Sequence, residues 1–369
     1  MTALAGILGS VLILAILWDA FETILLPRRI TRRFRITLLV QRGAWATLSW
    51  AVRLVQSRRH RENMLGLFAM LNLLLLLSVW AAGLIFGFAL LQWAAGSRLM
   101  LSGAKAGLVV DLYGSGTTFF TLGLGDVVPV SAAARALTVI EAGMGFGFLA
   151  LVLAYVPVLY QSFSRREARI TMMDEWAGSP PSAVELLQRC AESGDPTVIL
   201  GFLRDWELAA SELMESHLSY PLLAYFRSQH DNQSWIAALT TVLDACALII
   251  VGVEGVPPWQ AGLTFAIIRH AMVDLSQTFH RRPRAFEQDR LPPAELERVR
   301  AALRSSSVPM REGPEAERKL AELRGMYEPY VRALADYLLV PVPSWLPGTR
   351  RRYNWQTTAW ERTGRGHAH

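Results

Sequence analysis

The sequence predicts an all-α integral membrane protein whose first half crosses the bilayer and whose second half is a helical domain outside it. Of 369 residues, 52% are hydrophobic and 18% charged, whereas soluble domains contain about 45–50% apolar and about 25% charged residues. The charges are also uneven. Between Met64 and Ser164 the formal charges are Arg98, Lys105, Asp111, Asp126, Arg135 and Glu141. From Arg165 onward Arg, Glu and Asp are frequent again.

The net charge of +6 does not indicate a nucleic-acid-binding protein. Basic residues flank apolar segments instead of forming a basic and aromatic stripe, which is typical of membrane flanks. The two cysteines, Cys190 and Cys246, have no spacing of a zinc site or disulfide framework, and we expect buried thiols. No paired carboxylates, Ser-His-Asp set or metal-ligand cluster emerges, so we expect neither an enzyme nor a cofactor.

Three segments, 4–26, 65–95 and 132–160, have the roughly 20 apolar residues that cross about 30 Å of hydrocarbon. The first lacks a basic start and a small-residue cleavage site, so we expect a retained span and not a signal peptide. It carries Asp19 and Glu22 close to Arg28 and Arg29. Ion pairing at the cytoplasmic end is the favoured role for these carboxylates, and a sensor role is the alternative.

Segment 36–55 contains Gln41, Arg42 and Arg53, and its apolar residues recur at helical spacing. We favour an amphipathic helix in the membrane interface, with a spanning helix as the alternative. Basic residues surround it, and both clusters belong on the cytoplasmic side only if the segment does not span. These residues are Arg28, Arg29, Arg32, Arg33 and Arg35 before it, and Arg58, Arg59 and Arg61 after it.

This topology places the N-terminus outside and the second half in the cytoplasm of a multi-pass cell (inner) membrane protein. Between the second and third spans, the apolar run 108–120 is too short to cross, and glycines follow it at Gly123 and Gly125. Irregular backbone at membrane depth is tolerated only where it is buried in protein or lines water. We therefore expect a pore helix and a re-entrant loop.

The stretch Thr117-Thr118-Phe119-Phe120-Thr121-Leu122-Gly123-Leu124-Gly125-Asp126-Val127-Val128-Pro129 resembles the pore loop and selectivity filter of the potassium channel pore-domain family, T-x-x-T-V-G-Y-G-D followed by proline. Backbone carbonyls of four subunits can replace water around K⁺, and glycine allows the alternating backbone that this needs. The resemblance implies a homotetramer, with K⁺ as the permeant ion. The implied ion-binding residues are Thr121, Leu122, Gly123, Leu124 and Gly125, with K⁺ itself at the first four of these.

The resemblance also implies supporting residues. Thr117 and Thr118 would support the filter, and Asp126 would anchor its outer mouth. Leu124 replaces the usual tyrosine, which removes the ring that packs and hydrogen-bonds behind the filter, so we expect looser selectivity or a filter more prone to collapse.

The third span is similar to the family's inner helix. Gly143 and Gly145 are candidate gating hinges, and close helix packing is the alternative for Gly145. Glu141 is an ionisable residue within this span. It can lie behind the filter, face the cavity as a cation attractor, or be a protonated core carboxyl, and the sequence leaves these open.

The chain after Arg165 is punctuated by Pro, Gly and Ser into seven predicted helices without strand alternation. The apolar run 237–253 contains Asp244, and we favour a buried helix over a fourth span. The predicted regions are 1–62 (N-terminal span and interfacial helix), 63–164 (pore domain), 165–340 (cytoplasmic helical domain, which would bind an unknown ligand or protein) and 341–369 (basic, Trp-containing tail). A non-conducting membrane receptor or scaffold with a pore-like fold is the alternative function.

Overall fold

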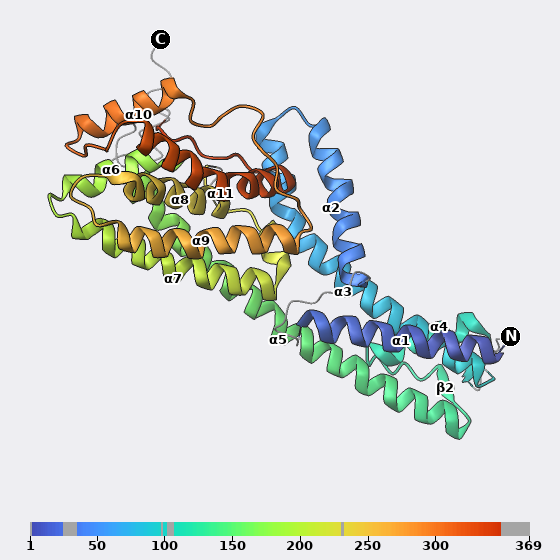
Figure 1. The fold of residues 1–369 in the computed structure, drawn as a ribbon. Coiled ribbons are helices and arrows are strands. Elements are labelled where there is room, and N and C mark those ends of the chain that lie inside the picture. The colour runs from blue at the N-terminus through green and yellow to red at the C-terminus, as the bar shows by residue number, and fades with distance from the viewer. Residues whose placement is uncertain (1, 25–34, 97–98, 102–106, 230–231, 348–369) are drawn as a thin grey trace, which may run out of the picture. The chain divides into compact units, whose positions relative to one another are not determined.

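The computed structural model describes residues 2–24, 35–96, 99–101, 107–229 and 232–347 (Figure 1). Nearly all of them are helical, which confirms the all-α fold class. The one pair of strands in this part of the chain is antiparallel, with β1 (Leu99–Leu101) against β2 (Val127–Pro129). The chain divides into two compact units, residues 1–161 and residues 162–369.

In the first unit α1 (Thr2–Ile24) runs beside α3 (Arg58–Ala94). Glycines allow the close approach. A Cβ at Gly83 would lie 2.3 Å from Cδ1 of Ile16, and one at Gly9 would lie 2.6 Å from the Gly87 carbonyl oxygen. Small residues at such contacts are typical of helices packed within a membrane, where van der Waals packing replaces the hydrophobic effect. The extra N-terminal span is thus packed onto the outer helix.

The helix α3 begins at Arg58, seven residues before the predicted start of the second span. The sequence prediction followed hydropathy alone, whereas Arg58, Arg59 and Arg61 continue the same backbone helix in its first turn. The preceding helix, α2 (Ile36–Leu54), packs on α3 through Trp45 and Phe68, whose ring centroids are 4.9 Å apart. It is not among the described helices that are long and apolar enough to cross a membrane.

A polar cluster joins the C-terminal part of α1 to the start of α2. Asp19 accepts hydrogen bonds at Oδ2 from the Thr37 amide (3.0 Å), the Thr37 hydroxyl (2.6 Å) and Trp80 Nε1 (2.9 Å). Arg35 Nε lies 3.5 Å from Glu22 Oε2. The described arginine that pairs with these carboxylates is therefore Arg35. The predicted partners Arg28 and Arg29, and the nearby Arg32 and Arg33, lie outside the described residues.

The long helix α5 (Ala132–Ala177) continues well past residue 160, where the sequence predicted its span to end. The charged residues after position 164 end the apolar segment without breaking the helix, because Arg, Glu and Ala are good helix formers. The helix stops where Gly178 takes a left-handed φ of 80°, followed by Pro180 and Pro181.

The second unit is a bundle around α8 (Trp235–Gly252). That helix has the length and hydropathy of a membrane span, yet 89% of its apolar stretch is buried, against 17–44% for α1, α3 and α5. We therefore assign it to the core, as the sequence predicted. The other helices are α6 (Ala183–Glu192), α7 (Thr197–Ser219), the 3₁₀ helix η1 (Pro221–Tyr225), α9 (Pro258–Thr278), α10 (Pro293–Ser305) and α11 (Pro314–Leu338).

An ion network crosses the core of this bundle. Arg290 Nη2 lies 2.7 Å from Asp244 Oδ2, its Nη1 lies 3.0 Å from Glu328 Oε1, and the Tyr327 hydroxyl also donates to Asp244. This pairing is what allows the carboxylate in α8 to be fully buried. Trp345 is 1% exposed and lies over Arg290. The packed unit thus extends into the region that the sequence assigned to the tail, and residues 348–369 lie outside the described part.

Candidate ion pore

The candidate filter follows directly on the C-terminus of α4 (Leu108–Phe119). The Thr121 amide donates to the Thr118 carbonyl (2.9 Å), and the Leu122 amide donates to the Thr117 carbonyl (2.8 Å). These two hydrogen bonds form a Schellman cap, a helix ending in which the residue that donates the first bond, here Thr121, takes a left-handed backbone. Thr117 and Thr118, predicted to support the filter, accept these two hydrogen bonds at the turn from helix to loop, and their supporting role stays a prediction.

The sign of φ alternates along the segment. Thr121, Gly123 and Gly125 have φ of 55°, 57° and 80°, whereas Leu122 and Leu124 are not among the residues with positive φ. A left-handed backbone was expected from sequence at Gly123 and Gly125, whereas that of Thr121 was not expected. Threonine is β-branched and pays roughly 1–2 kcal/mol for this conformation, so the cap holds Thr121 against its intrinsic preference.

Asp126 is fixed at the end of the segment by two donors. The Tyr113 hydroxyl donates to Asp126 Oδ2 (2.8 Å), and the Val127 amide donates to Oδ1 (3.0 Å). Tyr113 lies on α4, and the sequence analysis missed it. No distinctive local signal marked it, because α4 also carries Asp111, Ser115, Thr117 and Thr118. With leucine at position 124, Tyr113 supplies an aromatic hydroxyl beside the candidate filter from a different element.

Glu141 lies behind α4, where three helices meet. Its side chain is hydrogen-bonded to the Ser115 hydroxyl, which in turn donates to the Ile85 carbonyl oxygen (2.7 Å). The residue is 1% exposed within a single chain. A side chain enclosed by its own chain cannot line a cavity between subunits. The structure places Glu141 at the junction of α3, α4 and α5, which favours a position behind α4 over one facing a cavity, and its role stays a prediction.

The glycines of α5 differ sharply in their surroundings. A Cβ at Gly145 would lie 2.0 Å from the carbonyl oxygen of Phe119, the last residue of α4, whereas one at Gly143 or Gly147 would meet nothing within 4 Å. Gly145 thus allows α5 to touch the backbone immediately before the candidate filter. Close packing explains this glycine, and hinge bending at Gly143 or Gly145 stays a prediction.

The start of α5 is tied to the outer helix. Gln92, 2% exposed on α3, donates from Nε2 to the Ala134 carbonyl (3.2 Å) and to the Thr138 hydroxyl (3.3 Å). Together with the Ser115 contact and Gly145, this places the re-entrant α4 between two long helices. The arrangement is an outer helix, a short helix with a glycine-rich loop, and an inner helix.

Comparison with known families supports this arrangement. Residues 74–161 match the family described as ion channel. This segment is an ion-channel pore domain. It begins within α3 and ends within α5, at the last residue of the first unit. No curated protein and no solved structure matches the chain. The pore domain therefore carries the family resemblance, whereas α1, α2 and the second unit are interpreted from their own residues.

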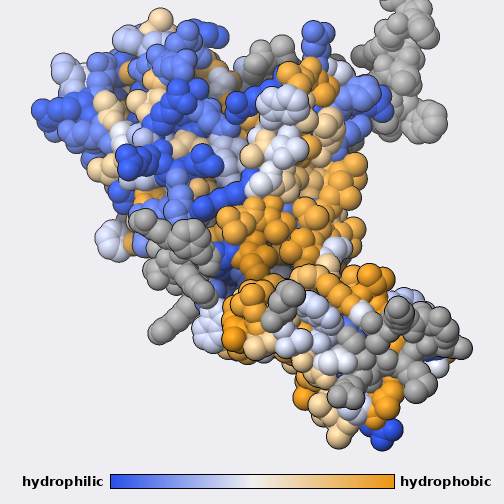
Figure 2. Space-filling model, turned by 90° about the vertical axis from the view of Figure 1, so that its right-hand side faces the viewer, coloured by the Kyte–Doolittle hydropathy of each residue, from blue (hydrophilic) through white to orange (hydrophobic). Residues whose placement is uncertain are grey.

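Three helices of the pore-containing unit, α1, α3 and α5, are long and apolar enough to cross a membrane. They also expose large apolar side chains, among them Leu14, Leu71, Phe146 and Leu153 at 59–69%. Figure 2 shows hydrophobic residues gathered over one part of the surface and hydrophilic residues over another. The protein is a membrane protein with an ion-channel domain.

Proposed function

We propose that the protein is a homotetrameric potassium channel of the cell (inner) membrane. Its filter would be formed by Thr121 to Gly125, with K⁺ at Thr121, Leu122, Gly123 and Leu124. The observation that carries this proposal is the alternation of φ sign at residues 121, 123 and 125 directly after the pore helix. Alternation of this kind lets successive carbonyl oxygens share one side of the chain, where they can replace the water around a cation.

Exposure of the pore domain supports assembly into a tetramer. Each chain supplies one re-entrant loop, and Leu122 and Leu124 are 61% and 63% exposed in a single copy. Along α5, four apolar side chains repeat with helical periodicity on one face, and all are exposed: Val139, Phe146, Leu149 and Leu153. We propose that neighbouring copies cover the loop and that this face of α5 lines the pore or contacts another copy.

The proposed gate lies on α5, at Gly143 or Gly145 or through the helical second unit, which we place in the cytoplasm. Both basic clusters then lie on the cytoplasmic side of the first two spans. No enzymatic step and no cofactor enters this proposal, because the permeant K⁺ is the cargo.

Flux into proteoliposomes tests conduction. We expect thallium influx with the wild-type protein and its loss in Gly123→Ala, because alanine at φ 57° disfavours the filter backbone. Gly116→Ala is the matched control. It lies on α4, three residues before the helix ends, and its Cβ would meet nothing within 4 Å. Equal flux in the wild type and Gly123→Ala would contradict the filter assignment, and no flux in properly inserted wild type would favour the receptor or scaffold.

Reversal potentials in mixed potassium and sodium test selectivity separately. We expect the reversal potential to shift toward the potassium equilibrium potential. This shift should be smaller than for a filter with tyrosine at position 124. Leu124→Tyr is the informative variant, because it restores the ring that the family pattern has there. A permeability ratio near one in both proteins would leave a cation channel and overturn the potassium assignment.

A further inference from the structure

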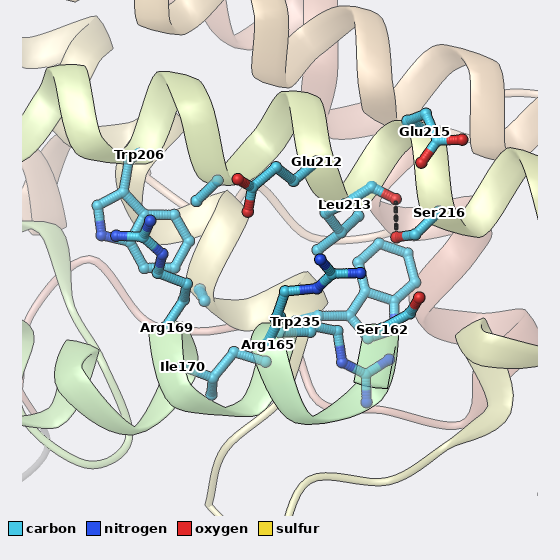
Figure 3. Close-up of a pocket in the computed structure, with 13 residues that line it drawn as sticks. Ser162, Arg165, Arg169, Ile170, Trp206, Glu212, Leu213, Glu215, Ser216 and Trp235 are labelled. Carbon is cyan, nitrogen blue, oxygen red and sulfur yellow. Dashed lines mark hydrogen bonds between the residues drawn. The ribbon is translucent and has the colours of Figure 1, made fainter. Parts of the chain in front are cut away.

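A cavity of about 150 Å³ lies in the second unit between the last part of α5, α7 and α8 (Figure 3). Every residue that lines it belongs to this unit, between positions 162 and 238. Protein interiors are normally filled to crystal-like density. An apolar cavity of roughly 150 Å³ is large enough to admit a benzene ring. The space is therefore large enough to take a small ring.

Part of the cavity wall is aromatic and aliphatic, and the rest is polar or charged. Trp206 of α7 and Trp235 of α8, which are 7% and 3% exposed, face the space together with Ile170 and Leu213. Both indoles are held in place. Trp235 Nε1 donates to the Ala224 carbonyl (3.3 Å), and the ring of Trp206 packs beside Phe202. Such fixed aromatic walls suit a flat apolar body.

The mouth of the cavity is charged. Arg165 and Arg169 lie one turn apart on α5, and Figure 3 shows both side chains reaching toward α7. Neither has an ion pair or hydrogen bond with any described residue. The third arginine, Arg166, is buried and engaged by Glu167, His217 and two carbonyls. The guanidinium groups of Arg165 and Arg169 are thus available to an anion.

Two carboxylates limit the charge of that anion. Glu212 faces the arginines from α7, and Glu215 accepts a hydrogen bond from the Ser219 hydroxyl (3.0 Å). A ligand with a second negative group would approach them and be repelled. A single carboxylate can instead be held by a planar guanidinium through two parallel hydrogen bonds.

We propose that this cavity binds a small planar organic acid with one carboxylate, its ring between Trp206 and Trp235 and its carboxylate at Arg165 and Arg169. The site includes the end of α5, the helix whose first part belongs to the ion-channel pore domain. A ligand that binds one conformation of this segment more tightly shifts its equilibrium. The second part of the proposal, which rests on the proposed function, is that occupancy changes ion flux.

Benzoate is the probe, titrated against the full-length protein in neutral phosphatidylcholine nanodiscs by calorimetry and by hydrogen exchange of residues 162–177 and 203–216. We expect saturable binding and slower exchange in both segments. Benzamide, the neutral isostere, should bind at least about tenfold more weakly because it cannot form the charge-assisted hydrogen bonds. Phthalate, the dianion, should also bind at least about tenfold more weakly because Glu212 and Glu215 repel its second carboxylate. Equal binding of benzoate and benzamide would overturn the assigned role of the arginines.

Arg169→Gln should weaken benzoate binding by about tenfold or more, because glutamine cannot form the charge-assisted hydrogen bonds. Arg204→Gln is the matched control, because Arg204 is an exposed arginine of α7 outside the cavity. A second variant, Ala209→Leu, fills the space without changing charge and should also abolish binding. Unchanged affinity in Arg169→Gln and Ala209→Leu overturns the site. Protection of the same segments by phosphatidylglycerol, with none by benzoate, overturns it in favour of a lipid headgroup.

Thallium flux with and without benzoate separates the site from the proposed function. Flux that changes with benzoate in wild type, but not in Arg169→Gln, supports both parts. If the protein binds benzoate but shows no thallium flux, the binding site stands and the channel proposal is contradicted. If thallium flux is present but benzoate does not bind, the binding site is contradicted and the channel proposal stands.

Discussion

The two units of this protein place helices of similar hydropathy in opposite environments. In the second unit the most apolar helix, α8, is enclosed, and the charge of Asp244 within it is matched by Arg290. In the first unit α1 and α5 keep most of their apolar surface exposed, and so do the leucines of the candidate filter. A helix of span-like composition is therefore a core element in one unit and an outward-facing element in the other.

This difference shows which surfaces each unit leaves uncovered within a single chain. The second unit buries its most apolar helix and pairs the charges in its core within one chain. The first unit has to find lipid or other copies for surfaces such as Phe146 and Leu153. Substitutions in the second unit should therefore act on its own stability, whereas substitutions in the first should act on assembly and conduction.

The largest expected effect is in the second unit. Arg290→Met leaves Asp244 and Glu328 buried without their shared partner, and breaking a buried pair in this way costs about 3–5 kcal/mol. Hydrogen exchange of the α8 amides should accelerate accordingly while pore-domain exchange stays unchanged. Arg284→Met is the control. Arg284 is 62% exposed, and surface ion pairs contribute about 0–1 kcal/mol. Similar exchange in both variants would contradict the self-contained core.

The next effect is in the pore domain. Gly145→Ala forces the new Cβ against the Phe119 carbonyl, and overpacking of this kind costs about 1–3 kcal/mol. We expect thallium flux to fall because the end of α4 must move. Gly143→Ala, with an open Cβ position, should conduct. If Gly143→Ala changes gating and Gly145→Ala does not, hinge bending and not packing explains these glycines.

A smaller effect is expected on the stability of the second unit when the pH is lowered. His217 is buried, and Nδ1 lies 2.9 Å from the Leu213 carbonyl while Nε2 lies 3.1 Å from Arg166 Nη1. An arginine can only donate, so Nε2 is the acceptor of a neutral ring. Burial, together with the Arg166 charge, holds the pKa of His217 well below its usual value.

The unfolded chain then binds a proton below pH of about 6.5 that the folded chain does not, so stability falls as pH falls. The second unit should lose up to about 1.4 kcal/mol per pH unit between roughly pH 6.5 and 5. Thermal unfolding at several pH values measures this loss. His217→Gln, which retains an acceptor and a donor, should flatten the dependence. An identical slope in that variant would assign the titration to other groups.

The smallest effect is expected at the outer end of the candidate filter. Tyr113→Phe removes the hydroxyl that donates to Asp126 while leaving Val127 as a donor. We expect normal assembly and shorter open periods in single-channel records. Asp126→Asn should also weaken the filter, and the double variant should add little if the two residues act through one hydrogen bond. Fully additive effects would contradict that coupling.

The sequence predicted the helix boundaries well where Pro, Gly or Ser marks them. The helices of the second unit begin and end within a few residues of Pro, Gly and Ser positions such as Ser182 and Pro257. The end of α5 was missed because hydropathy marks where a helix leaves an apolar environment, and not where its hydrogen bonds stop. Only Gly178 and the prolines that follow carried that second signal.

The candidate filter was predictable because its chemistry lies in one short run of sequence. The contacts around it were not, because they join residues far apart in the chain. Tyr113 meets Asp126 across the loop, Ser115 meets Glu141, and Arg35 meets Glu22. Sequence left three interpretations open for Glu141, and the packing of α3, α4 and α5 favours the two in which the side chain is buried. The cavity beside Arg169 likewise depends on three separate helices.

The continuity of α5 has a practical consequence for dissecting the protein. The compact units meet between residues 161 and 162, yet no helix end lies there, because hydrogen bonding runs unbroken from Ala132 to Ala177. Cutting at this point would leave four carbonyls without partners at the new C-terminal end and four amides without partners at the new N-terminal end. The pore domain and the helical unit are thus separate packed units that share one helix. A shortened protein that contains the pore domain should therefore keep all of α5 and end at Gly178.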